Sequence, residues 1–160
     1  MSLLYDPCRE PEGIEGFVYC AHRPFHPRRF SRLLGAEWPG ISRIKGFVWI
    51  ASCMDTVGMW TWADGICTVS PAGRWWAARP ERDWPASLTV RAEIRRGWHA
   101  AYGDRRQEVV FIGAEMSRDR ITRNLDALLL TEEEMAQGEA TGWACFADEP
   151  EPTEPRRCDP

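Results

Sequence analysis

The eight residues from Arg23 to Phe30, with the sequence RPFHPRRF, constrain the fold of this chain more than any other stretch. A proline is well tolerated in the first turn of a helix, because its missing N–H needs no partner there and its φ angle is already helical. Pro27 therefore predicts that a helix begins at this point, with His26 as its N-cap. An i, i+3, i+4 spacing of apolar residues from Phe30 onward supports the same helix.

Short apolar strands and amphipathic helices alternate along the rest of the chain. We expect strands over residues 17–21, 44–52, 57–62, 66–69 and 109–114. Asp64 and Gly65 favour a hairpin turn between the third and fourth of these strands. We expect helices from Pro27 to Trp38, over 89–98, from the N-cap Ser117, and from a capping box at Thr131 that ends before Gly138.

This order of elements predicts an α+β domain. Its mostly antiparallel sheet would have four to five strands and helices packed on one face, in a ferredoxin-like arrangement with an added C-terminal helix. Residues 1–15 look like a linker-like lead-in, and residues 16–146 form the folded domain. Residues 147–160 are rich in proline and acidic side chains, which predicts a disordered tail.

The composition excludes several classes of function. A net charge of -4 argues against a general nucleic-acid binder, since such domains carry a basic excess. Lys45 is the sole lysine, and it does not lie in a Gly-Lys-Ser/Thr motif, so the chain has no P-loop. The six cysteines form no C-x-x-C pair, and we find no signal peptide or apolar run of about 20 residues. These features predict a cytoplasmic protein with reduced thiols and no membrane span.

Five blocks occur in a characteristic order along the chain: residues 16–19, 23–30, 45–49, 103–113 and 125–135. In this order they resemble the C-terminal domain of the CobW-type GTPase metallochaperones, over roughly residues 14–146. The resemblance implies a non-catalytic interaction or regulatory domain in the trafficking of zinc or cobalt, including cobalamin biosynthesis. Its implied partners are a CobW-type GTPase domain, in cis or in trans, and a client metalloprotein.

That GTPase half carries a P-loop and a C-x-C-C metal motif in the family, and this chain has neither. The resemblance therefore implies no enzyme activity for this chain by itself. The sequence leaves open the client, the metal, the oligomeric state, and whether Met1 is a natural start.

Cys20, His22 and His26 form a C-x-H-x3-H pattern, and thiolate and imidazole are natural ligands for zinc or cobalt. A free-standing metal-binding protein that uses these three residues is the second hypothesis. The alternative is a strand cysteine, a surface histidine and a histidine N-cap. The resemblance supplies His26 alone, because relatives typically have arginine at the positions of Cys20 and His22.

The segment from Lys45 to Ile50 resembles the strand signature of RNA-recognition motifs, so an RNA-binding module is the third hypothesis. Val48 stands where that signature has Gly or Ala, and Ser52 stands where it has an aromatic residue. The alternative is a buried central strand, with Phe47 and Trp49 in the core or under a helix.

Two further groups of residues are candidates for a partner interface. Arg105 and Arg106 lie in a charged turn, where Asp104 could position an arginine for an anion or a partner carboxylate. Trp60 and Trp62 would share one face of a strand, and tryptophan is enriched at interface hot spots. The alternative for the arginines is a solvated turn with local ion pairs. The alternative for the tryptophans is that their rings belong to the core, and we expect the same for part of the Trp75-Trp76 pair.

Overall fold

The structure is a computed structural model that describes residues 14–143 and the backbone of Arg156 and Arg157. Its sheet runs in the order β1-β5-β2-β3-β4-β6, and every neighbouring pair of strands is antiparallel. The strands are β1 (Glu15–Ala21), β2 (Ile41–Val48), β3 (Thr56–Ala63), β4 (Ile66–Arg74), β5 (Gln107–Gly113) and β6 (Arg156–Arg157).

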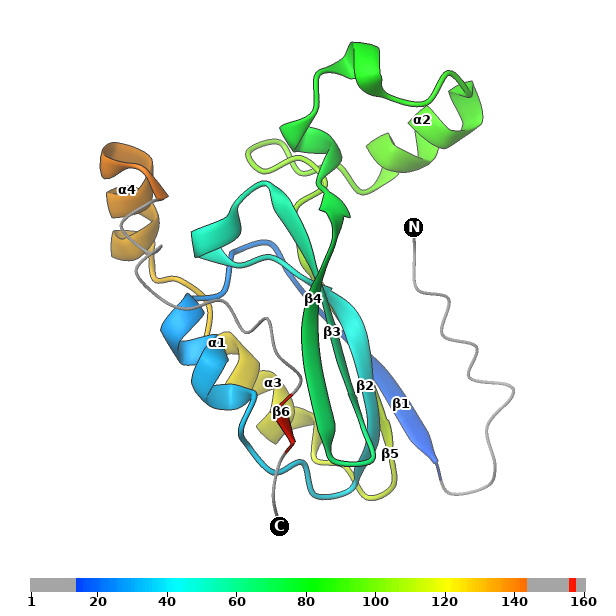
Figure 1. Cartoon of the computed structure of the whole chain (residues 1–160), viewed down its shortest axis with the longest axis vertical. Helices are drawn as coiled ribbons and strands as arrows, with labels where there is room; N and C mark the ends of the chain where they lie inside the picture. The colour runs from blue at the N-terminus through cyan, green and yellow to red at the C-terminus, as the bar shows by residue number, and fades with distance from the viewer. Residues whose placement is uncertain (1–13, 144–155, 158–160) are drawn as a thin grey trace.

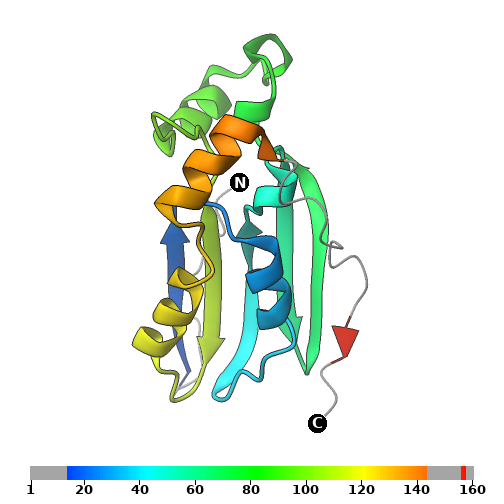
Figure 2. The same ribbon diagram turned by 90° about the vertical axis from the view of Figure 1, so that its left-hand side faces the viewer.

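The helices cover one face of this sheet, as Figure 2 shows for α1, α3 and α4. By contrast, α2 stands beyond one end of the strands (Figure 1). The four helices are α1 (Pro27–Leu33), α2 (Leu88–Arg96), α3 (Arg118–Asp126) and α4 (Glu132–Thr141). The expected α+β class, with an antiparallel sheet and helices on one face, is confirmed. The predicted lead-in and tail lie outside the described residues, apart from residues 14–15 and the two residues of β6.

The predictions that depend on neighbouring residues alone are confirmed. The His26 side chain caps α1 by accepting a hydrogen bond from the Arg28 N–H at 3.2 Å. Thr131 and Glu134 form the expected capping box of α4. Asp64 and Gly65 make the two-residue turn between β3 and β4 with φ angles of 53° and 76°, the left-handed values that such hairpins require.

Several predicted boundaries were wrong. The helix expected to reach Trp38 ends at Leu33, and the strand expected over 66–69 continues to Arg74. The strand expected over 44–52 ends at Val48, because the next residues turn to pair with Phe25 and the short 3₁₀ helix η2 (Ala51–Cys53) begins. Gly138 lies inside α4 rather than beyond its end, and the helix stops at Gly142, where φ is 88°. A side chain at Gly138 would run into the Trp143 ring, so this glycine allows close packing instead of ending the helix.

Aromatic rings from both layers form the centre of the core. Trp60 of β3 lies with its ring 5.5 Å from Phe30, 5.7 Å from Trp38 and 6.0 Å from Phe111, measured between centroids. Such pairs contribute about 0.5–1.5 kcal/mol each beyond the burial of their surface. Trp60 therefore joins β3 and β5 to α1 and to the chain that follows it.

The residues between β1 and α1, which we call the junction segment (residues 23–26), are paired on two sides. Phe25 donates its N–H to the Trp49 carbonyl at 2.8 Å and accepts from the Ala51 N–H at 3.0 Å. On the other side, the Leu130 N–H donates to the Pro24 carbonyl at 2.9 Å. The junction segment thus links the end of β2 to the connection between α3 and α4.

The fully buried Gln107 side chain links the junction segment to the residues that follow β2. Its Oε1 accepts from the Trp49 N–H at 3.0 Å, and its Nε2 donates to the carbonyls of Arg23 and Trp49 at 2.9 and 2.8 Å. A buried amide with all these partners satisfies backbone groups that no strand reaches.

We predict that Gln107→Leu lowers the free energy of unfolding by roughly 2–5 kcal/mol, since it leaves buried backbone groups at Trp49 and Arg23 without this partner. Urea unfolding followed by tryptophan fluorescence measures the change. Gln137→Leu, at an exposed position of α4, is the matched control. An equal effect of the two substitutions would contradict the assigned role of Gln107.

Candidate interaction surface

The three residues predicted to bind a metal are not brought together. Cys20 is exposed on β1 opposite Glu108, whereas His26 caps α1. The His22 ring stacks on His99, with 5.0 Å between centroids, in the direction of the segment that carries α2. Within residues 14–143, no three His, Cys, Asp or Glu side chains are placed to hold a metal ion. The metal site therefore stays a prediction that the geometry does not support.

The electrostatics at Cys20 also oppose thiolate chemistry. Partial burial, followed by the nearby Glu108 carboxylate, raises the pKa of the Cys20 thiol, and the Arg106 guanidinium offsets only part of this rise. Because the thiolate is the form that attacks electrophiles and binds metals, a raised pKa makes this thiol less reactive near neutral pH.

We predict that Glu108→Gln speeds the alkylation of Cys20 by iodoacetamide at pH 7–8, because it removes the negative charge that raises the thiol pKa. The rate is followed by mass spectrometry of the Cys20 peptide. The Cys67 peptide, whose cysteine is buried, is the internal reference. A slower or unchanged rate at Cys20 would contradict the assigned effect of Glu108.

The arginines of the RPFHPRRF block turn toward the connection between α3 and α4. Arg23 donates to the Leu130 carbonyl at 3.0 Å, and Arg29 donates to the Leu129 carbonyl at 3.1 Å. Arg29 also pairs with Glu134 at 2.6 Å. Burial raises the pKa of the Glu134 carboxyl, but its hydrogen bond from the Thr131 N–H and its pairing with Arg29 outweigh burial, so the net pKa is lowered. These side chains thus stabilise the fold.

A carboxyl whose pKa is lowered by folding adds stability above its unfolded pKa and loses that stability as the pH falls through its folded value. We therefore predict that Glu134→Gln flattens part of the decline in stability between about pH 5 and pH 3. Urea midpoints measured across this range test it, with Glu133→Gln, an exposed neighbour on α4, as the control. Identical pH profiles for all three proteins would contradict the role of Glu134.

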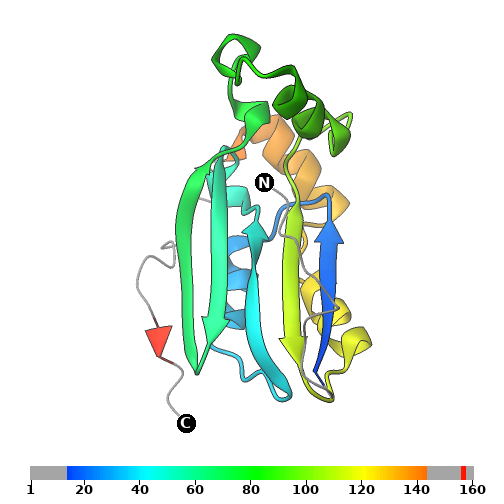
Figure 3. The same ribbon diagram turned by 90° about the vertical axis from the view of Figure 1, so that its right-hand side faces the viewer.

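The segment that resembles an RNA-binding strand alternates between the two faces of β2. Val48 and Trp49 are fully buried, which confirms the expectation for Trp49. Lys45 and the half-buried Phe47 alternate with buried residues of β2, so they lie on the face without helices, opposite Val110 and Glu108 of β5. Figure 3 shows this face of the sheet. Phe47 is thus the one aromatic ring that this segment offers on that face. This segment therefore does not form the surface of alternate aromatic rings on which RNA bases stack.

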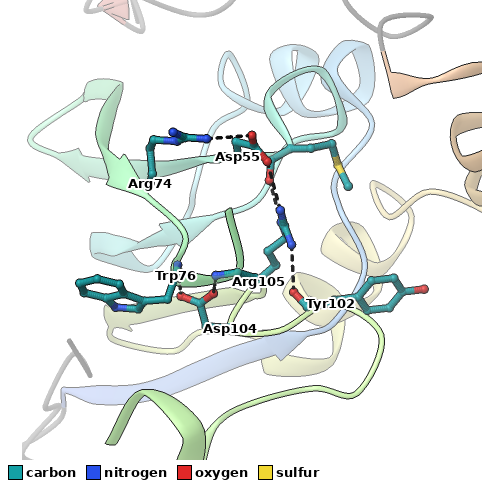
Figure 4. Close-up of polar contacts among 8 residues, drawn as sticks. Asp55, Arg74, Trp76, Tyr102, Asp104 and Arg105 are labelled. Carbon is teal, nitrogen blue, oxygen red and sulfur yellow. Dashed lines mark hydrogen bonds and ion pairs between the residues drawn. The ribbon is translucent and has the colours of Figure 1, made fainter. Parts of the chain in front are cut away.

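The charged turn before β5 is anchored to its own chain, as Figure 4 shows. Asp104 is buried and accepts hydrogen bonds from the N–H groups of Trp76 and Ala77 at 2.9 and 2.8 Å, so it caps the short helix η3 (Trp76–Ala78). Arg105 donates to the Met54 carbonyl at 2.9 Å and pairs with Asp55 at 3.1 Å.

Arg106 pairs with Glu108 at 2.6 Å and donates to the Asp104 carbonyl at 2.9 Å. The predicted interface arginines are therefore both used inside the fold. The sequence placed Asp104 beside an arginine, whereas the structure shows it binding backbone N–H groups far along the chain, which no local pattern could indicate.

The predicted tryptophan pair lies in the core. Trp60 is fully buried, and Trp62 is partly buried against the same core cluster. Trp75 is also buried. The expectation that part of these rings belongs to the core is correct. Trp60 and Trp62 therefore leave little exposed surface for contact with a partner.

Exposed apolar side chains gather elsewhere, on the projecting segment (residues 75–103). Five large apolar residues are exposed in the described part of the chain, and three of them, Leu88, Val90 and Trp98, lie on α2 or just after it. No residue of α2 is buried. The helix predicted over 89–98 is present, but the sequence could not show that it stands away from the core.

Three tryptophan rings in contact form the base of the projecting segment, one pair edge-to-face and the other tilted. Trp84 lies 6.2 Å from Trp76 and 5.4 Å from Trp98 between ring centroids. The guanidinium of Arg95 sits 5.7 Å above the Trp84 ring, within the range of a cation–π contact. The segment is thus held in place by its own side chains, and it presents α2 as the candidate interaction surface.

No helix in the described residues is long and apolar enough to cross a membrane.

A one-sided α+β sheet of this kind defines a class of small domains, and the fold recurs within a larger protein. The crystal structure of the Zn(II)-bound YjiA GTPase from E. coli matches with a TM-score of 0.50 and 16% identity, over 74% of this chain and 30% of that chain.

The chain belongs to the family of the cobalamin synthesis protein CobW C-terminal domain, whose sequence model matches residues 14–129. It is 39% identical over 140 residues to a zinc-regulated GTPase metalloprotein activator of Dictyostelium discoideum, covering 85% of this chain and 29% of that protein. It is 29% identical over 136 residues to a zinc chaperone of Mycobacterium tuberculosis, covering 81% of this chain and 32% of that protein. The chain thus spans about a third or less of the length of these relatives.

Proposed function

We propose that this chain is a non-catalytic interaction domain of a CobW-type system for zinc trafficking. It would bind a GTPase domain, in cis or in trans, and help to direct metal to a client metalloprotein in the cytoplasm. Family membership across residues 14–129 is the observation that carries this proposal. The names of the Dictyostelium and Mycobacterium relatives favour zinc over cobalt as the metal.

The site geometry supports a binding role. The polar residues of the charged turn are occupied within the fold, since Asp104, Arg105 and Gln107 each bind backbone groups. They build a rigid frame from which α2 projects, with its apolar residues exposed. A rigid frame that presents an exposed helix suits recognition of another protein.

Binding to a GTPase partner is directly testable. The probe is the part of the Dictyostelium relative that lies outside its match to this chain, purified alone. We expect the chain, added in trans, to form a complex with a Kd of roughly micromolar order in isothermal titration calorimetry. The corresponding C-terminal region of the relative itself, added in trans, is the positive control. A complex with that control, but none with this chain at about 100 μM, would refute the proposal.

A further inference from the structure

The outward side of α2 carries a pattern that the fold does not use. Leu88, Ala92 and Arg96 are spaced at i, i+4 and i+8, so their side chains fall along one stripe of the helix. All three are exposed, and Leu88 retains 83% of its surface, the largest value among the exposed apolar residues. We call these residues the outer stripe.

The helix that carries the outer stripe is held by its N-cap and by two arginines, Arg91 and Arg95, that flank the stripe. The Ser87 hydroxyl caps its N-terminus by accepting from the Val90 N–H. Arg91 donates to the Pro85 carbonyl at 2.7 Å, and Arg95 pairs with Glu81 at 2.8 Å. A short helix in water is marginally stable by itself, so these contacts keep it formed. A partner would therefore meet the outer stripe already ordered, which lowers the entropic cost of binding.

The projecting segment also differs in charge from the rest of the chain. Residues 75–103 contain five arginines against three carboxylates, a net charge of +2, whereas the whole chain carries -4. Arg91 and Arg95 are engaged within the segment, but Arg96 forms no ion pair with the described part of the chain. A positively charged, partly apolar helix fits an acidic protein surface.

We propose that α2 is a recognition helix whose outer stripe enters an acid-rimmed apolar groove on the GTPase partner. The groove would provide an apolar pocket for Leu88 and a carboxylate roughly 12 Å away for Arg96, the distance that eight residues of helix span. Helix-in-groove binding commonly uses anchors at i and i+4 in this way. This inference rests on the proposed function, because it names the surface and chemistry of that interaction.

A nucleic acid fits the outer stripe less well. Glu81, Asp83 and Glu93 interrupt the arginines, and a phosphate backbone would be repelled by these carboxylates. Leu88 offers no aromatic face on which a base could stack. The partner expected here is therefore a protein.

The test compares Leu88→Asp and Arg96→Glu with the unaltered chain, using calorimetry against the GTPase part of the Dictyostelium relative. We expect each substitution to weaken binding about tenfold or more, and the effect of Arg96→Glu to shrink at high salt. Ile66→Asp on β4 and Arg123→Glu on α3 are the matched controls at exposed positions, and we expect them to change Kd less than twofold. Circular dichroism confirms that each variant is folded.

The outcomes separate the two proposals. Unchanged binding with both α2 substitutions would overturn the recognition helix and leave the proposed function standing. If the unaltered chain does not bind although the relative's own C-terminal region does, the proposed function and the inference that rests on it both fail. Binding of single-stranded RNA that Arg96→Glu weakens to the same degree would assign the outer stripe to a nucleic acid and overturn the inference.

Discussion

The structure depends on the pairing of one short piece of chain, the junction segment between β1 and α1. Its backbone bonds to Trp49 and Ala51 on one side and to the α3–α4 connection on the other. The Gln107 amide satisfies the groups that remain on a third side. Because a buried backbone polar group without a partner is costly, these bonds together determine where β2 ends, where α1 begins and how α4 is reached. The aromatic core around Trp60 then fills the space that this arrangement encloses.

This dependence explains why so many charged residues of the five sequence blocks bind groups of the chain itself. Arg23 and Arg29 bind carbonyls after α3, and Asp104 caps η3. Arg105 holds the turn after η2 through Met54 and Asp55. Residues of this kind look like parts of a binding site in the sequence, yet they form the frame of the domain. The surface that we propose for recognition is one that this frame does not use, the outer side of α2.

Sequence reasoning succeeded where the cause is local. The His26 cap, the Thr131 capping box and the Asp64-Gly65 turn each depend on residues a few positions apart, so a pattern of residue types is enough to predict them. It could not place the predicted metal ligands relative to one another, because Cys20 lies on the open face of β1 while His26 is fixed at the start of α1. It also failed for Gly138, whose role depends on where the Trp143 ring packs.

The sequence by itself determined the α+β class, the family and most of the helix and strand positions, since these follow from periodicity, capping and turn chemistry. Only the tertiary structure decided which polar residues are free to act. Asp104 and Gln107 reach backbone groups 28 and 58 residues away, and no local pattern shows such a distance. The same is true of α2: its apolar spacing resembles that of a core helix, and it is exposed because the sheet ends before it could cover that helix.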